Sequence, residues 1–317
     1  MLKKAQIRLI SHLKKLYSKN VNLIQYMNSN EEFKEMSLQQ KVLLAYDLQS
    51  GSYTKAYQSE LVSTLKHQGG TKIAKILNNL DISTVLDAGT GEGTTLADII
   101  LNVEKNISFA AFDISLSRLL YAQKFLISKS IILPYLFTSD LLNISLASSS
   151  TDLIMTFHAV EPNGGQEDAI CQELHRVSRK YALLIEPSWE FADLQQKNRM
   201  EEHGYIKNLP EYLKKAGFQI LVHEPWGLDV NPINKAAIIL AKKEESASSI
   251  SQDFQYAYPS TDYLLKNIPD GDGLYCEELG VLFPKFNQIP CLLSSSAIVA
   301  TRYFEALTIE HESYTNL

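Results

Sequence analysis

The chain has 317 residues, of which 45% are hydrophobic and 21% are charged. This composition excludes an intrinsically disordered chain, a collagen-like repeat and a small disulfide scaffold. Because single cores stop growing at roughly 250–300 residues, the length favours one large domain with additions, or two domains.

The charge is divided along the chain. Residues 1–80 hold twelve Lys/Arg and five Asp/Glu, a net charge of +7, whereas residues 81–244 carry −6 and residues 245–317 carry −7. This division predicts a basic head on an acidic body. No run approaches the ~18 apolar residues that a membrane span needs. Three scattered cysteines favour a reducing compartment over a secreted disulfide framework, so we expect a cytoplasmic protein.

The first eighty residues predict a helical extension. Residues 2–19 place leucines at helical spacing among lysines, which predicts an amphipathic helix with one apolar face and a basic remainder. We favour a helix that packs on the body with its lysines in water; the alternative is contact with a membrane surface or a phosphate backbone. Residues 31–80 predict further helices, interrupted by turns at 49–52 and at Gly69-Gly70.

From residue 84 onward, short apolar runs alternate with helical patterns. This alternation predicts an α/β fold with a doubly wound, mainly parallel sheet of seven strands and helices on both faces. Only a loop rich in Pro and Asn separates the last two strands, which therefore favour an antiparallel pair. The expected strands contain residues 84–86, 109–112, 135–137, 153–157, 182–185, 218–222 and 236–241, and the expected helices lie near 94–104, 116–129, 166–179, 193–203 and 209–217.

The most informative stretch joins the first strand to three glycines. Asp87 lies in the strand, and Gly89, Gly91 and Gly93 follow at alternate positions before a helix. Glycines here permit a tight turn and a close approach of backbone to ligand at a helix N-terminus. A dinucleotide-binding loop would prefer glycine at the position of Thr94. A nucleotide-binding domain of another kind is the alternative.

Two further acids follow the next two strands, in Asp113-Ile114 and Asp140-Leu141. Together with the glycine loop they make residues 80–243 resemble the class I S-adenosylmethionine-dependent methyltransferases, whose first motif has the form (V/L)LD-x-G-x-G-x-G. Three acids at three successive strand ends are a more specific combination than any lone glycine motif. The resemblance implies S-adenosylmethionine as cofactor.

The resemblance also implies a role for each acid. Asp87 and the glycine backbone would hold the methionine part of the cofactor, Asp113 with Ile114 the ribose, and Asp140 with Leu141 the adenine.

Upstream of the first strand, the resemblance implies that an N-terminal segment closes over the cofactor. Tyr46, Gln49 and Tyr53 combine aromatic and amide side chains in a turn-like stretch, which suits that role. A plain helix-ending turn is the alternative, because Gly, Ser and Asp favour turns. We therefore divide the chain into a helical extension and cofactor lid at 1–80, a cofactor-binding domain at 81–243 and a small module at 253–317.

The reacting side of the site is expected after the fourth strand. His158 and Glu161 follow this strand, and His203 ends a later helix; these groups can take a proton from a hydroxyl or amine acceptor. The residues that begin at Glu161 do not match the family's N-methylating (D/N)PP(Y/F) motif. This mismatch weakens the case for an amide or nucleobase nitrogen as the methyl acceptor. Glu186, at the end of the fifth strand, would add to a polar pocket or a divalent-metal site, although no fixed ligand spacing is visible.

The tail reads as a polar linker at 244–252 followed by a loop-rich module. This module resembles the small zinc-ribbon-like proteins that activate tRNA, rRNA and release-factor methyltransferases. Leu279 stands where that pattern has its second cysteine, and tetrahedral zinc needs four ligands. We expect a metal-free remnant whose role is packing. The matching positions are Cys276, Gly280, Phe283, Pro284, Ile289, Pro290 and Leu293.

The leading hypothesis is a methyltransferase acting on a hydroxyl, amine or carboxylate of a small or conjugated metabolite, such as a glycan or a secondary-metabolite intermediate. The first alternative is a tRNA, rRNA or protein methyltransferase, but an acidic body argues against a long nucleic-acid footprint. The second is a cofactor-binding scaffold without transfer activity. If a membrane or nucleic acid is a partner, residues 1–20 should carry the contact. The sequence leaves the oligomeric state open.

Overall fold

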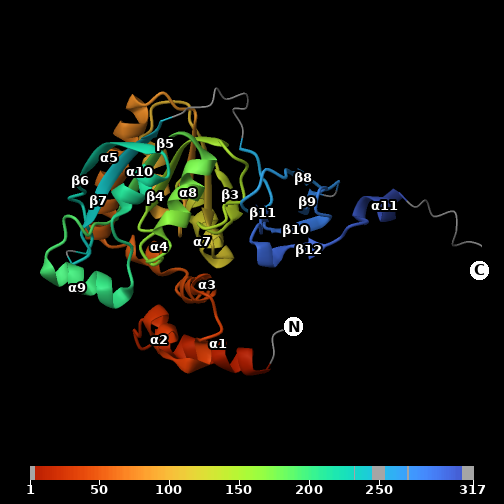
Figure 1. Ribbon diagram of the computed structural model, residues 1–317, viewed down its shortest axis with the longest axis horizontal. Coiled ribbons are helices and arrows are strands. Elements are labelled where there is room, and N and C mark those ends of the chain that lie inside the picture. The colour runs from red at the N-terminus through yellow and green to blue at the C-terminus, as the bar shows by residue number, and fades with distance from the viewer. Residues whose placement is uncertain (1–3, 232, 245–253, 270, 309–317) are drawn as a thin grey trace, which may run out of the picture.

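The computed structural model describes residues 4–231, 233–244, 254–269 and 271–308. A helical N-terminal region, a central sheet with helices on both faces and a small C-terminal sheet follow one another along the chain (Figure 1). The predicted linker, apart from Glu244, lies outside the described residues. Within the described ranges, none of the helices has the length and apolarity needed to cross a membrane.

The central sheet confirms the predicted doubly wound, mainly parallel α/β fold. Its strands are β1 (Thr84–Ala88), β2 (Ser108–Asp113), β3 (Tyr135–Thr138), β4 (Thr151–Phe157), β5 (Ser178–Pro187), β6 (Phe218–Pro225) and β7 (Ala236–Lys243). They lie in the order β3-β2-β1-β4-β5-β7-β6. β1 to β5 are mutually parallel, and β7 is antiparallel to both of its neighbours. The expected antiparallel last pair is therefore also confirmed.

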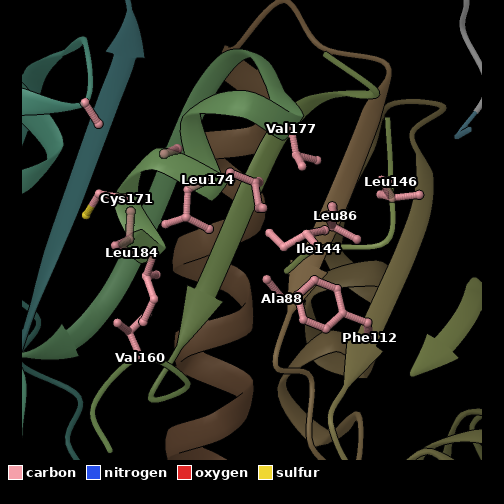
Figure 2. Packing of buried hydrophobic residues seen from close by; sticks show 14 of the residues in the cluster. Leu86, Ala88, Phe112, Ile144, Leu146, Val160, Cys171, Leu174, Val177 and Leu184 are labelled. Carbon is pink, nitrogen blue, oxygen red and sulfur yellow. The ribbon is translucent and has the colours of Figure 1, made fainter. Parts of the chain in front are cut away.

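Helices cover the two faces of this sheet, and each face has its own apolar core. Because side chains of a strand alternate between faces, Val85 packs with α5, α6 and α7, whereas Leu86 and Ala88 pack with α8 and α10. Figure 2 shows the cluster that contains Leu86 and Ala88, to which α8 contributes Leu174 and Val177; this helix contacts β4 and β5. The helices of this domain are α5 (Glu60–Asn79), α6 (Thr94–Asn102), α7 (Leu116–Ser128), α8 (Glu167–Val177), α9 (Leu194–His203) and α10 (Leu209–Lys215).

One expectation is wrong: α5 runs without interruption through Gly69 and Gly70. A Cβ at Gly70 would come within 2.5 Å of the Asp98 Cβ on α6, and one at Gly69 would lie 3.1 Å from the Trp226 ring. The two glycines therefore let α5 approach α6 and Trp226 closely. This packing offsets the helix-propensity penalty of about 1 kcal/mol for each glycine.

The N-terminal helices form a small core of their own. The predicted amphipathic helix is present as α1, and Leu13 is fully buried in a cluster with Leu23, Met27 and Phe33. Thus α1 packs on α2 and α3, with Lys14 and Lys15 exposed. The favoured interpretation is right about the exposed lysines, but the partner is these helices rather than the body. These elements are α1 (Lys4–Tyr17), α2 (Leu23–Ser29), η1 (Glu31–Phe33), α3 (Leu38–Leu48) and α4 (Ser52–Ala56).

The C-terminal module is a second, small sheet that packs on the edge strand β3 (Figure 1). Thr138 of β3 forms a parallel bridge with Cys291, and the Leu292 N–H donates to the Thr138 Oγ1 at 2.9 Å. Phe283 and Leu292 belong to the same core cluster as the central sheet. The module contains β8 (Leu265–Asn267), β9 (Gly273–Cys276), β10 (Val281–Phe286), β11 (Ile289–Pro290), β12 (Ile298–Val299), η2 (Ser294–Ser296) and α11 (Tyr303–Thr308).

Candidate functional site

A cavity of about 480 Å³ lies between the carboxyl ends of the central parallel strands and the helices α3, α4 and α5. In open α/β sheets, ligands bind at this edge, where the strand order reverses; here the reversal lies between β1 and β4. Eleven of the predicted site residues line the cavity: Tyr46, Tyr53, Asp87, Gly89, Gly91, Asp113, Ile114, Asp140, Leu141, His158 and Glu161.

The structure places the other three predicted residues outside the cavity lining. Gly93 is the N-cap of α6, and a Cβ there would lie 3.2 Å from the Ala122 Cβ of α7, so this glycine serves helix packing. Gln49 is the C-cap residue of α3. His203 is held by Arg199, with the His203 Nδ1 at 2.9 Å from the Arg199 carbonyl and the Nε2 at 3.3 Å from Nη1.

Asp87 and Asp113 are buried at the strand ends, whereas Asp140 is half-buried. Asp113 accepts the N–H groups of Gly91 at 3.0 Å and Ser115 at 2.9 Å, one on each oxygen. A carboxylate offers about four lone-pair sites, so both oxygens keep capacity for a ligand. Burial raises the pKa of Asp113 and of Asp140, and raises that of Asp87 to about 6.

The glycine loop, Gly89 to Gly93, lines the cavity with backbone that no side chain covers at Gly89 and Gly91. Gly89 and Gly91 have φ values of +82° and +59°, where side chains are strained. A Cβ at Gly89 would come within 2.4 Å of the Ala159 Cβ, and one at Gly91 would point at Arg118 and Tyr53, 3.4 and 3.5 Å away. The loop therefore needs glycine at both positions.

Arg118 is a cavity residue that the sequence analysis missed. It is buried, and its guanidinium carbon lies 4.5 Å from the ring centroids of both Tyr46 and Tyr53. Its Nε also donates to the Tyr46 carbonyl at 3.0 Å. This stacked arrangement ties the body to both predicted lid tyrosines.

Glu92 is a second residue that the sequence analysis missed. It is fully buried inside the glycine loop. Its carboxylate accepts three backbone N–H groups, from Gly51 at 2.8 Å, Tyr53 at 3.2 Å and Thr54 at 2.7 Å. These groups start α4, where N–H donors lack helical partners. Glu92 therefore fastens the segment that carries Tyr53 directly to the glycine loop.

On the reacting side, His158 and Glu161 form a close pair. The His158 Nδ1 lies 2.7 Å from the Glu161 Oε2, which also accepts from the Asn234 Nδ2 at 3.3 Å. Burial opposes a charge on the ring, but the hydrogen bond and the charge of Glu161 outweigh it and raise the pKa of His158. His158 has a φ of +53°, a conformation that is uncommon outside glycine and often found at functional sites.

Glu186 lies behind this pair rather than in the cavity lining. One of its oxygens accepts the N–H groups of Ala159 at 3.0 Å and Val160 at 3.2 Å, and the other accepts that of Glu161 at 3.2 Å. Burial raises the pKa of Glu186 to about 7. It therefore holds the loop that presents His158. Within the described part of the chain, no three His, Cys, Asp or Glu side chains are grouped for a metal ion.

The remaining wall is largely apolar and carries one lysine. Trp226 meets the Phe157 ring edge-on at 5.9 Å between centroids. The Lys66 Nζ donates to the Thr95 Oγ1 at 2.7 Å and lies 5.2 Å from the Phe157 centroid. Burial lowers the pKa of Lys66 to about 8, against the pull of nearby acids.

No family model and no curated protein match the chain. A solved structure that it resembles is magnesium protoporphyrin IX methyltransferase (ChlM) from Synechocystis PCC 6803 with bound SAM, at 15% identity and a TM-score of 0.50, over 67% of this chain and 99% of that chain. The chain has the Rossmann-like methyltransferase fold. The same enzyme with bound SAH matches this Rossmann-like methyltransferase fold at 14% identity and a TM-score of 0.48, over 63% and 98% of the two chains. A SAM-dependent methyltransferase from Aquifex aeolicus matches it at 18% identity and a TM-score of 0.41, over 53% and 87%.

Proposed function

We propose that this protein is an S-adenosylmethionine-dependent methyltransferase that methylates a hydroxyl group of a small or conjugated metabolite. The observation that carries the proposal is the pairing of His158 with Glu161 in the same cavity as the glycine loop and the strand-end acids. A carboxylate acceptor is ionised already and needs no base. An amine can lose its proton to water before it binds, whereas a hydroxyl keeps its proton until its oxygen attacks.

The chemistry of the lining residues fits this cofactor. Asp113 has free acceptor capacity for two ribose hydroxyls, and Asp140 for an adenine amino group. Gly89 and Gly91 leave backbone uncovered where the methionine part would lie. The proposal of this cofactor therefore rests on the hydrogen-bond donors and acceptors that line the cavity, and not on the similarity of the fold.

The reaction needs one proton acceptor and an in-line approach. When bound, the cofactor would supply an electrophilic methyl carbon on a sulfonium, whose sulfur would keep the electron pair of the C–S bond and leave as a neutral thioether, so the acceptor oxygen would gain the methyl group. His158 accepts the hydroxyl proton at Nε2 as the O–C bond forms, and later releases it to solvent. Glu161 holds the Nδ1–H, so it fixes the tautomer and stabilises the charged ring. Glu186 keeps this loop in place through its backbone bonds.

For the C-terminal module we propose a packing role without metal. Cys276 and Cys291 are free and buried, and burial raises the pKa of both thiols. Zinc binds the thiolate form, which burial disfavours here. Buried free thiols are also in keeping with the reducing, cytoplasmic location that we propose.

The test is transfer from methyl-labelled S-adenosylmethionine to a panel of hydroxylated metabolites, with detection of S-adenosylhomocysteine and of the O-methyl product. We expect turnover with at least one acceptor, and a rate at least about 100-fold lower for His158→Gln. Binding of S-adenosylhomocysteine without turnover over the whole panel would favour the scaffold alternative and contradict the proposal.

A further inference from the structure

Three cationic side chains line the cavity: Lys66, Arg118 and Arg199. Among the described residues, no carboxylate oxygen lies within 4.0 Å of any of them. Cations beside a ligand cavity that lack ion-pair partners are typical of sites for anionic ligands. The amino-acid end of the proposed cofactor offers one carboxylate, so the cavity holds more positive groups than the cofactor uses.

Two of the three cations are engaged in the cofactor half, the part of the cavity beside the glycine loop, although Lys66 also lies 5.2 Å from the centroid of the Phe157 ring. Arg118 is stacked between the lid tyrosines next to Gly91. Lys66 donates to Thr95, in the first turn of α6, which begins directly after the glycine loop. Arg199 is therefore the cation left for the acceptor.

Arg199 is held in place by two groups that are not carboxylates. Its Nη2 donates to the Tyr205 hydroxyl and its Nη1 faces the His203 Nε2, each at 3.3 Å. Its Nε has no partner among the described residues, and a buried donor without a partner calls for an explanation such as a ligand. Burial and the charge of nearby Glu161 raise the pKa of Tyr205. One side chain, Tyr205, thus separates the Arg199 guanidinium from the proposed catalytic pair. The guanidinium is oriented by its neighbours, but no carboxylate of the described residues pairs with its charge.

The acceptor half combines three asparagines, Asn163, Asn231 and Asn234, with an apolar wall. Its wall comes from α5, from the end of β4 and from the β6–β7 connection. The apolar lining residues are Val62, Leu65, Phe157, Trp226, Leu228 and Val230. A wall of this kind favours an apolar or aromatic body over a bare sugar.

We infer that the acceptor carries an oxyanion group, a carboxylate or a phosphate, which Arg199 binds while a hydroxyl on its apolar body faces His158. The inference rests on the proposed function and narrows its acceptor to hydroxylated acids. The planar guanidinium matches either oxyanion with two parallel N–H donors, and so Arg199 would decide specificity without taking part in the transfer itself.

The test is calorimetry on the full chain saturated with S-adenosylhomocysteine. One arm compares para-hydroxyphenylacetate with para-hydroxyphenylacetamide, and the other compares para-hydroxybenzylphosphonate with its dimethyl ester. We expect the oxyanion member of at least one pair to bind at least about tenfold more tightly than its neutral partner. The arm with the larger ratio tells carboxylate from phosphate.

Variants on α9 show whether Arg199 causes the preference. Arg199→Gln should bring the ratio to within about twofold, and Arg199→Lys, which keeps the charge without the fork, should restore part of it. Lys197→Gln is the matched control, because Lys197 lies on the same helix but does not line the cavity; it should keep the full ratio.

The inference is overturned if the neutral members bind as tightly as the oxyanions, if no oxyanion binds, or if the ratio survives in Arg199→Gln. Arg199 lies outside the cofactor half, so its variants should bind S-adenosylhomocysteine as the unaltered chain does, which also shows that they fold. Failure of the unaltered chain to bind S-adenosylhomocysteine would instead contradict the proposed function.

Discussion

At the scale of single residues, Asp113 combines two roles in the cofactor half of the cavity, one structural and one proposed for ligand binding. It holds the Gly91 and Ser115 backbone and keeps capacity for a ligand. Asp113→Ala removes the proposed acceptor for two ribose hydroxyls, and hydrogen bonds to charged groups contribute about 1.5–3 kcal/mol each. We expect calorimetry to show loss of S-adenosylhomocysteine affinity by at least about 100-fold. A retained near-ultraviolet spectrum would show that the fold persists, and unchanged affinity would refute the assignment.

His158 predicts a specific pH dependence. The pKa of His158 is raised above its usual value of 6.5, and a general base works only when unprotonated. Thus kcat/KM should rise with pH through this raised pKa and level off above it. Glu161→Gln removes the charge that raises the pKa, so the midpoint should move to lower pH while the plateau falls. A midpoint that moves upward in this variant would show that Glu161 does not act on His158.

The residues that sequence reasoning found and those it missed differ in kind. Asp87, Asp113 and Asp140 each lie at the end of a predicted strand, so the local pattern is enough to bring them to one edge of a parallel sheet. Arg118 and Glu92 act through partners about seventy and forty residues away, and no local signal marks those contacts. A single charged residue in a helix or a loop is normally solvated, so only the fold distinguishes these two.

At the scale of elements, the structure makes the start of α4 depend on Glu92. Glu92→Ala removes the partner of three part-buried N–H donors, at a cost of about 1–3 kcal/mol for each donor that water does not reach. Hydrogen exchange should therefore speed up at 51–57, and S-adenosylhomocysteine affinity should fall by about tenfold. The matched control is Glu60→Ala, an exposed acid in the first turn of α5, which should change neither. Equal exchange in both variants would mean that Glu92 does not fasten the segment 51–57.

The pair of helices α5 and α6 gives a stability prediction. Alanine is the better helix former by about 1 kcal/mol, yet a Cβ at Gly70 would meet the Asp98 Cβ at 2.5 Å and its backbone carbon at 2.7 Å. Overpacking of this kind costs about 1–3 kcal/mol, so Gly70→Ala should lower the free energy of unfolding in urea. Gln68→Ala, at an exposed position on the same helix, should leave it unchanged or raise it. Stabilisation by Gly70→Ala would contradict the close packing described here.

Gly69 and Gly70 also show why the ends of helices and strands are hard to predict from sequence. Gly69-Gly70 has the composition of a turn, but its purpose is contact with Trp226 and Asp98. By contrast, the strands and helices from 84 to 243 follow from hydrophobic periodicity, because in a doubly wound fold the buried strands are continuously apolar.

At the scale of the whole molecule, the division of charge corresponds to separate parts of the structure. The basic head is the set of helices α1 to α5, whereas the acidic tail packs on β3 and shares the core of the central sheet through Phe283 and Leu292. That shared core joins segments about 150 residues apart, such as Thr138 and Leu292. Composition can indicate a separate module, but not the edge strand on which it packs.

The central claim is that one cavity holds the methyl donor and presents its acceptor to His158. A crystal structure of the full chain with S-adenosylhomocysteine tests it most directly. The account predicts adenine at Asp140 and Leu141, ribose hydroxyls on Asp113, and the sulfur directed toward His158. Absence of the ligand from this cavity at saturating concentration, or its sulfur directed away from His158, would contradict the account.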